Sequence, residues 1–131
     1  NDEPLSEACA RAVKDLGGGV IVYALSGSKM MDCAAKVGVR AVAECFADRG
    51  YSDDGTLAPR NKPGGLIEDE KQSVAQALSM VEQGIVTSLS GKRVAVAPGT
   101  LCLHGDQPGA VAFAKALRAA FKDHGITVAA P

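Results

Sequence analysis

The sequence predicts an α/β fold in which the strands of a parallel sheet alternate with helices. Two observations lead to this prediction. Segments with helical apolar periodicity alternate with short β-prone runs along the chain, which is the order typical of α/β proteins. The run at residues 20–25 is apolar throughout, as expected for a strand that is covered on both faces and is therefore parallel. With 131 residues, of which 47% are apolar, the chain fits one domain with a sizeable core.

The opening segment is expected to form a helix, a strand and a second helix. The first helix begins at Pro4, and the three glycines at residues 17–19 stop it. Its apolar stripe consists of Leu5, Ala8, Cys9, Ala12, Val13 and Leu16. A strand at residues 20–25 follows, and then a helix at residues 28–37 that ends at Gly38. The apolar side of that second helix holds Met30, Met31, Ala34 and Ala35.

The remaining elements are predicted in the same way. A strand at residues 39–46 leads into a polar loop, and Asp69 is expected to cap a helix that ends at Gly84. Two β-prone runs, at residues 85–89 and 93–97, flank a Gly-containing turn and predict a hairpin. A strand at residues 100–103 precedes a last helix, closed by Gly125. The inward faces of the two helices are expected to hold Val74, Ala77, Leu78 and Val81, and Ala110, Phe113, Ala114, Leu117 and Phe121.

Polar side chains lie at or just beyond the end of each of the three predicted parallel strands. They are Ser26 and Ser28 after the first strand, Glu44, Asp48 and Arg49 at the second, and His104 and Asp106 after the third. The carboxyl ends of parallel strands share one edge of a sheet, and ligands bind at that edge in α/β folds. The sequence therefore predicts a functional site there.

Each of these residues also has a structural explanation. Asp106 could only cap the last helix and His104 could only be a turn residue, while Ser26 and Ser28 could cap the second helix or present backbone amides to an anion. Glu44 could pair with Arg49 to hold the following loop, because structural and functional ion pairs look alike in a sequence. The residue pattern leaves these alternatives open.

Composition narrows the function classes. A net charge of −1 and an aromatic content of 4% argue against nucleic-acid binding. The sequence shows neither a membrane-spanning run nor a signal-peptide pattern, so a cytoplasmic protein is expected. The four cysteines form no CxxC pair and are expected to be reduced core thiols. Two histidines are too few for a three-histidine zinc site within this chain. Because the chain begins with Asn1, processing or truncation is expected.

Three segments together are typical of one protein family: Glu44-Cys-Phe-Ala-Asp-Arg-Gly-Tyr51, Gly55-Thr-Leu-Ala-Pro-Arg-Asn-Lys-Pro-Gly64 and Cys102-Leu-His-Gly-Asp-Gln-Pro-Gly-Ala-Val111. They resemble the LamB/YcsF family, which supplies the A subunit of bacterial ATP-dependent 5-oxoprolinase. Leu25-Ser-Gly-Ser28 and the pairing of Gly84 with Gly91 also match. The order and spacing agree over almost the whole chain.

The resemblance implies a β/α barrel of the glycoside hydrolase/deacetylase type. It implies ATP-driven hydrolytic opening of the lactam 5-oxo-L-proline to L-glutamate, carried out with partner subunits. Family members carry an amino-terminal half that is absent here, so the chain is expected to be the C-terminal part of such a barrel. It forms either a single domain over residues 1–131 or a partial barrel. A partial barrel leaves strand edges that must associate with the missing half or with a second copy.

The site residues receive roles on the same basis. His104, Asp106 and Glu44 are the expected catalytic residues. Arg49, Asp48, Ser26, Ser28 and Arg60 are the expected substrate-binding residues. ATP, with magnesium, is the expected cosubstrate, although no GxxxxGK[ST] loop is present, and no tightly bound metal is expected. Two alternatives stand beside this reading. One is a metal-assisted carbohydrate hydrolase or deacetylase that uses His104, Asp106 and Glu44 as ligands, and the other is a catalytically incomplete interaction fragment.

Overall fold

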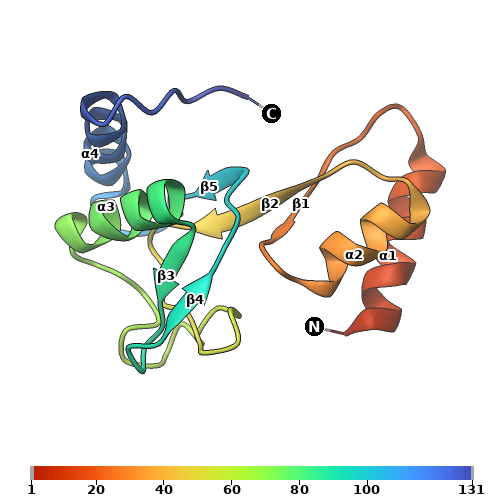
Figure 1. The fold of residues 1–131 in the computed structure, drawn as a ribbon, viewed down its shortest axis with the longest axis horizontal. Helices are drawn as coiled ribbons and strands as arrows, with labels where there is room; N and C mark the ends of the chain where they lie inside the picture. The colour runs from red at the N-terminus through yellow and green to blue at the C-terminus, as the bar shows by residue number, and fades with distance from the viewer. Residues whose placement is uncertain (1, 131) are drawn as a thin grey trace.

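The computed structural model describes residues 2–130. The helices are α1 (Glu3–Leu16), α2 (Lys29–Val37), α3 (Glu70–Leu78), the π-helical turn η1 (Ser79–Gln83) and α4 (Ala110–Asp123). The strands are β1 (Val22–Leu25), β2 (Ala41–Phe46), β3 (Ile85–Thr87), β4 (Arg93–Ala95) and β5 (Thr100–Cys102). In Figure 1, α1 and α2 lie together on the right, α3 and α4 lie together on the left, β1, β2 and β5 run between the two pairs, and β3 and β4 lie below α3.

The main sheet has three strands in the order β1-β2-β5, and both pairings are parallel. Glu44 in the central strand is level with Leu25 of β1 and with Thr100 of β5. The pairing continues beyond the strands, because Ala47 donates its backbone N–H to the carbonyl of Cys102 at 3.0 Å. The α/β class, the parallel sheet and the three strands that form it are therefore confirmed.

The predicted hairpin and the predicted helix ends are also present. β3 and β4 pair antiparallel, with Val86 opposite Val94. Asp69 caps α3 by accepting the backbone N–H of Gln72 at 2.7 Å, as N-terminal aspartates do. Gly84, which ends the helical segment, has a left-handed backbone with φ of 66°, a conformation that glycine adopts without steric cost.

The core consists of two clusters on either side of the end of β2. One lies between β2 and the hairpin and contains Cys45, Tyr51, Met80 and Val86. The other lies between α3 and α4 and contains Ala47, Ala77, Leu117 and Phe121. Because Cys45 and Ala47 lie two residues apart and each belongs to one cluster, the end of β2 is held by packing in both directions.

The prediction that the apolar stripe of the first helix is buried is wrong. Leu5 and Leu16 are 63% and 76% exposed, and Cys9, expected to be a core thiol, is exposed as well. The buried residue of α1 is Ala10, which lies outside the apolar stripe. The physical reason is that α1 packs chiefly against α2, whose buried residues Cys33 and Ala34 are small, so a small side chain makes the close contact.

The prediction that both faces of the first strand are covered is also wrong. β1 is parallel to β2, but Tyr23 is 48% exposed, so the strand is not covered on both faces. On α2, Ala34 is buried as predicted, whereas Ala35 is exposed and the two methionines are only partly buried. No helix within residues 2–130 has the length and apolar character needed to cross a bilayer.

Candidate active site

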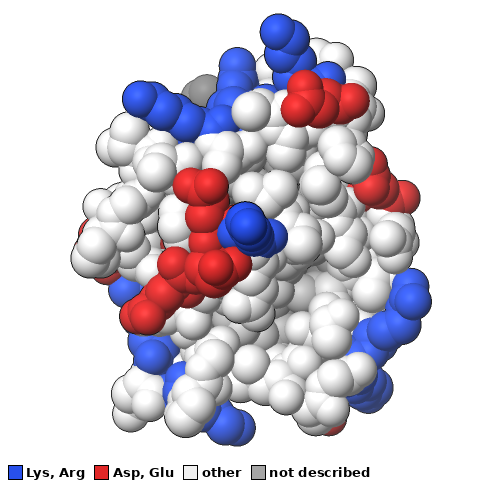
Figure 2. Space-filling model, turned by 90° about the vertical axis from the view of Figure 1, so that its left-hand side faces the viewer, with Lys and Arg blue, Asp and Glu red and all other residues white. Residues whose placement is uncertain are grey.

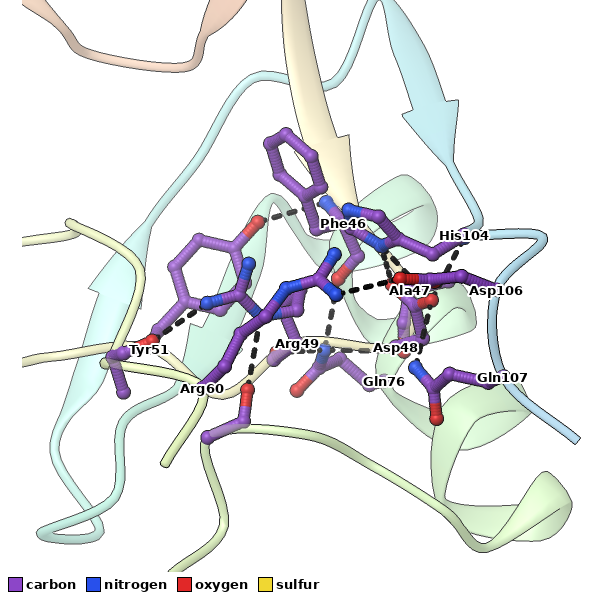
Figure 3. A network of polar contacts seen from close by, with 12 residues as sticks. Phe46, Ala47, Asp48, Arg49, Tyr51, Arg60, Gln76, His104, Asp106 and Gln107 are labelled. Carbon is purple, nitrogen blue, oxygen red and sulfur yellow. Dashed lines mark hydrogen bonds and ion pairs between the residues drawn. The ribbon is translucent and has the colours of Figure 1, made fainter. Parts of the chain in front are cut away.

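The centre of the candidate site is a contact between Asp48 and His104. Asp48 lies two residues beyond the end of β2, and His104 lies two residues beyond the end of β5. The imidazole Nδ1 of His104 is 2.9 Å from Oδ1 and 3.1 Å from Oδ2 of Asp48. The backbone N–H of His104 also donates to Oδ2 at 2.8 Å. The carboxylate therefore fixes both the main chain and the ring of His104 (Figure 3).

The carboxylate of Asp48 is buried, with 1% of the residue exposed. A buried charge is costly unless hydrogen-bond donors surround it. Here a further donor is supplied by Gln107, whose Nε2 lies 3.2 Å from Oδ2. The Asp48 side chain thus accepts from one ring, one backbone amide and one side-chain amide, which holds it in a single orientation.

This arrangement determines the tautomer of His104. An ionised carboxylate can only accept hydrogen bonds, so Nδ1 must carry the proton that it shares with Asp48. The neutral ring then has an unprotonated Nε2 on the side away from Asp48. The ring is 22% exposed, and Phe46 stacks on it with the two ring centroids 5.8 Å apart. His104 therefore presents an oriented nitrogen base to its open side.

An exposed ion pair lies beside this contact. Arg60, in the loop after β2, donates to Oδ2 of Asp106 at 2.8 Å, as Figure 3 shows. The guanidinium lowers the pKa of Asp106. The alternative that Asp106 caps α4 is wrong, because Gly109 is the N-cap residue and no side chain caps that helix. Arg60 draws the Asp106 side chain toward the polar loop instead.

Arg49 acts as a clamp on the loop that follows β2. Its Nε donates to the carbonyl of Gly65 at 3.0 Å, and its Nη2 donates to the carbonyl of Ala58 at 2.7 Å. The residue is 8% exposed. Within residues 2–130 no ion pair joins Glu44 to Arg49, so the alternative of a structural pair between them is wrong. The guanidinium turns into the loop and binds these two main-chain carbonyls, and Glu44 remains on the central strand.

The other predicted site residues are less closely associated. Glu44 is partly buried on the central strand of the sheet. Burial raises the pKa of the Cys102 thiol, and the charges of Glu44 and Asp48 raise it further. Ser26 accepts the backbone N–H of Ala97 at 2.9 Å and so joins β1 to the chain after β4. The buried Oγ of Ser28 has no hydrogen-bond partner among the described residues, and it does not cap α2.

The described side chains do not favour a cysteine nucleophile or a metal site. Burial is the main cause that raises the pKa of both Cys45 and Cys102, which favours the protonated thiols over the reactive thiolates. No group of three or more His, Cys, Asp or Glu side chains in the described part of the chain is placed to hold a metal ion. His104, Asp106 and Glu44, the ligands expected for the metal-assisted alternative, do not gather into such a group.

Sequence reasoning misses three residues of this region. Phe46 lies at a predicted strand end and Gln107 in a matched segment, but the sequence assigns neither a role, and Gln76 is only one residue of a predicted helix. Neutral amides and a single aromatic residue carry no charge pattern, and their function depends on contacts between distant segments. The position of Gln107 three residues after His104 is the one signal in the sequence.

Comparisons with known proteins agree with the fold and with these segments. The LamB/YcsF family model matches residues 1–131. The chain is 46% identical over 127 residues to the 5-oxoprolinase A subunit 2 of Bordetella bronchiseptica, covering 97% of this chain and 50% of that protein. It is 43% identical over 129 residues to the 5-oxoprolinase A subunit of Bordetella parapertussis, covering 98% and 51%. The chain spans about half the length of these curated relatives.

A solved structure gives the same result. The crystal structure of the lactam utilization protein from Thermus thermophilus superposes with a TM-score of 0.89 at 39% sequence identity, covering 100% of this chain and 52% of that one. The family model spans every residue, and the relatives match nearly the whole chain. The chain belongs to the LamB/YcsF family.

Proposed function

We propose that this chain forms part of a 5-oxoprolinase, an enzyme that opens the lactam ring of 5-oxo-L-proline by ATP-dependent hydrolysis and yields L-glutamate. The observation that carries the proposal is the Asp48–His104 contact at the carboxyl ends of two adjacent parallel strands. It lies in a chain that is 46% and 43% identical to proteins named as A subunits of 5-oxoprolinase. The contact provides the oriented base that hydrolysis of an amide requires.

His104 serves as the proton carrier in this mechanism. An unstrained lactam is a stabilised amide, so its opening requires water to attack the carbonyl carbon while the ring nitrogen gains a proton. Nε2 of His104 removes a proton from the attacking water and can return it to the leaving nitrogen. Asp48 stabilises the imidazolium that forms between the two steps, because its buried carboxylate contacts Nδ1 at 2.9 Å.

The polar groups around His104 bind the substrate. Arg60 is exposed and can exchange Asp106 for the carboxylate of 5-oxoproline, since a guanidinium recognises planar carboxylates. Asp106 then becomes free to accept a proton near His104. Glu44 provides a second carboxylate on the central strand, where it accepts hydrogen bonds from the ring N–H of the lactam. Arg49 contributes by shaping the loop, and Ser26 and Ser28 are the proposed substrate contacts at the end of β1.

The ATP-dependent step is assigned to groups outside this chain. The chain has no GxxxxGK[ST] loop, so ATP is bound in another way or by another subunit. We therefore propose that activation of the lactam oxygen depends on partner subunits and on the remainder of a complete subunit, which also completes a β/α barrel. The relatives' names as subunits support the existence of such partners.

The test is an assay of glutamate release from 5-oxo-L-proline by the complete subunit with its partner subunits. His104→Ala should lower kcat by about 100-fold or more, the usual contribution of a general acid–base residue, and Asp106→Asn should lower kcat as well, because an amide cannot accept the proton. His124→Ala is the matched control, because His124 pairs with Glu82 at the far end of α4. Near-normal turnover by a folded His104→Ala variant removes His104 from the mechanism.

A further inference from the structure

Gln76 holds the turn that carries Asp48. It projects from α3 toward the end of β2, and its Nε2 lies 3.0 Å from the carbonyl oxygen of Phe46, 3.3 Å from that of Ala47 and 2.9 Å from that of Arg49. These three residues surround Asp48 in the sequence. One side-chain amide therefore binds the main chain on both sides of the buried carboxylate (Figure 3).

The chemistry of these contacts requires the amide group. All three neighbours are carbonyl oxygens, which only accept hydrogen bonds, so the NH₂ group and not the side-chain oxygen must face them. Its two hydrogens serve three acceptors, and at least one of them is shared. A carboxylate at the same place could not donate, and an apolar side chain would leave the carbonyls without this donor.

Gln76 joins α3 to this turn through its hydrogen bonds to the main-chain carbonyls. A cavity of about 440 Å³ lies beside it, lined by residues of α3, of β3 and of the loop, including Gly50, Gln72, Ser79 and Leu89. The surface on this side of the molecule, which includes α3 and α4, is visibly hollowed in Figure 2. The turn is thus held by the amide of Gln76 as well as by the packing of Ala47 in the cluster between α3 and α4.

We infer that Gln76 is a positioning residue for catalysis, which sets the distance and orientation of Asp48 relative to His104. The inference rests on the proposed role of His104. Gln76 acts at a distance from the imidazole, since its amide binds main-chain carbonyls. Its influence passes through the turn to the carboxylate, and from there to Nδ1. A displacement of about 1 Å in such a group lowers turnover by as much as 100-fold.

Two variants separate positioning from simple stability. Gln76→Glu retains the length of the side chain but cannot donate when ionised. Gln76→Met retains its bulk without any donor, and it is the variant to use if Gln76→Glu does not fold. Gln72→Glu is the matched control, because Gln72 lines the same cavity, is exposed, and makes no side-chain hydrogen bond among the described residues.

The first readout is catalysis by the complete subunit with its partner subunits. A folded Gln76 variant should lose about 10-fold to 100-fold in kcat while KM stays within about threefold. Gln72→Glu should match the wild type in both constants. A folded Gln76→Met variant with wild-type kcat overturns the inference.

The second readout does not depend on activity. Imidazole ¹⁵N resonances of His104 and His124 are assigned in the complete subunit by comparison with the His104→Ala and His124→Ala variants. The wild type should show His104 protonated at Nδ1, and the Gln76 variants should shift the His104 resonances while those of His124 stay unchanged. A loss of kcat with unaltered His104 resonances assigns the loss to stability and overturns the positioning role. If the wild type opens no 5-oxoproline, the spectra still decide whether Gln76 controls His104.

Discussion

The hydroxyl oxygen of Tyr51 accepts the backbone N–H of Phe46 at 2.8 Å, so that a side chain completes the hydrogen bonding of the last residue of β2. Tyr51 is fully buried, and burial raises the pKa of its phenol. The ring belongs to the core cluster with Cys45, Met80 and Val86. This contact ties the end of the strand to the loop that follows it.

Tyr51→Phe should therefore destabilise the protein. The substitution retains the ring but leaves the N–H of Phe46 without its acceptor, a loss of about 1–3 kcal/mol for a buried polar group. Urea unfolding monitored by circular dichroism measures the effect. Tyr23→Phe is the control, since Tyr23 is 48% exposed on β1, and its free energy of unfolding should remain at the wild-type value. Equal stability of the two variants would contradict the importance of the Phe46 contact.

Asp48→Asn should lower turnover more than it lowers stability. The side-chain amide can still receive the backbone N–H of His104, but it cannot both accept from Nδ1 and stabilise an imidazolium. We expect kcat to fall by about 100-fold to 10,000-fold, the range attributed to general acid–base catalysis. Steady-state kinetics of the complete enzyme measure the effect. Asp53→Asn is the control, because it replaces a carboxylate elsewhere in the chain. A kcat within about twofold of wild type for Asp48→Asn would exclude Asp48 from catalysis.

The carboxylate of Asp53 should make the stability of the protein depend on pH. Hydrogen bonds from Ser88 and Ser90, each 2.6 Å long, lower the pKa of Asp53 in the folded state. A group with a lowered folded pKa stabilises the protein above its unfolded value of about 3.9, and this stabilisation is lost as the pH falls through the folded pKa. Asp53→Asn should reduce the difference in unfolding free energy between neutral pH and about pH 3. Ser88→Ala and Ser90→Ala should each reduce the same difference, and an unchanged difference in both variants would contradict the role of the two serines.

The apolar stripe on α1 should make the isolated chain associate with itself. Leu5 and Leu16 are 63% and 76% exposed on one side of the helix, and exposed apolar surface of this kind promotes association. The double substitution Leu5→Lys and Leu16→Lys should lower the average mass measured by light scattering toward that of a monomer. Lys14→Leu, on another side of the same helix, should not lower it. A wild-type chain that is monomeric at high concentration would refute this prediction.

The sequence is a good guide to the elements and to the position of the site. Apolar periodicity and glycine positions predict each helix and strand, because those signals depend on neighbouring residues. The fold brings Asp48 next to His104 and Arg60 next to Asp106, and the roles expected of these residues stay predictions. The matched LamB/YcsF segments supply Arg60, which no spacing rule indicates.

The details that the sequence does not reveal depend on contacts between distant segments. Nothing in the pattern around Arg49 distinguishes a guanidinium that binds backbone carbonyls from one that binds a substrate. The apolar stripe of α1 has the periodicity of a buried face, yet the small residues of α2 select Ala10 as the contact. Gln76 is one of several polar residues on α3, and only the folded chain brings it to the carbonyls near Asp48.

The clamp formed by Arg49 also bears on where proteases can cut the chain. Backbone hydrogen bonds from Gly50 to Gly65, from Ala58 to Gly50 and from Ile67 to Asp48 accompany it, so the loop resists the local opening that cleavage requires. Residues 17–19 are the opposite case, because all three glycines are exposed and a Cβ atom added to any of them would meet no other atom within 4 Å. We therefore expect a protease that accepts small residues to cleave the chain between α1 and β1. The much longer loop after Asp48 should stay intact.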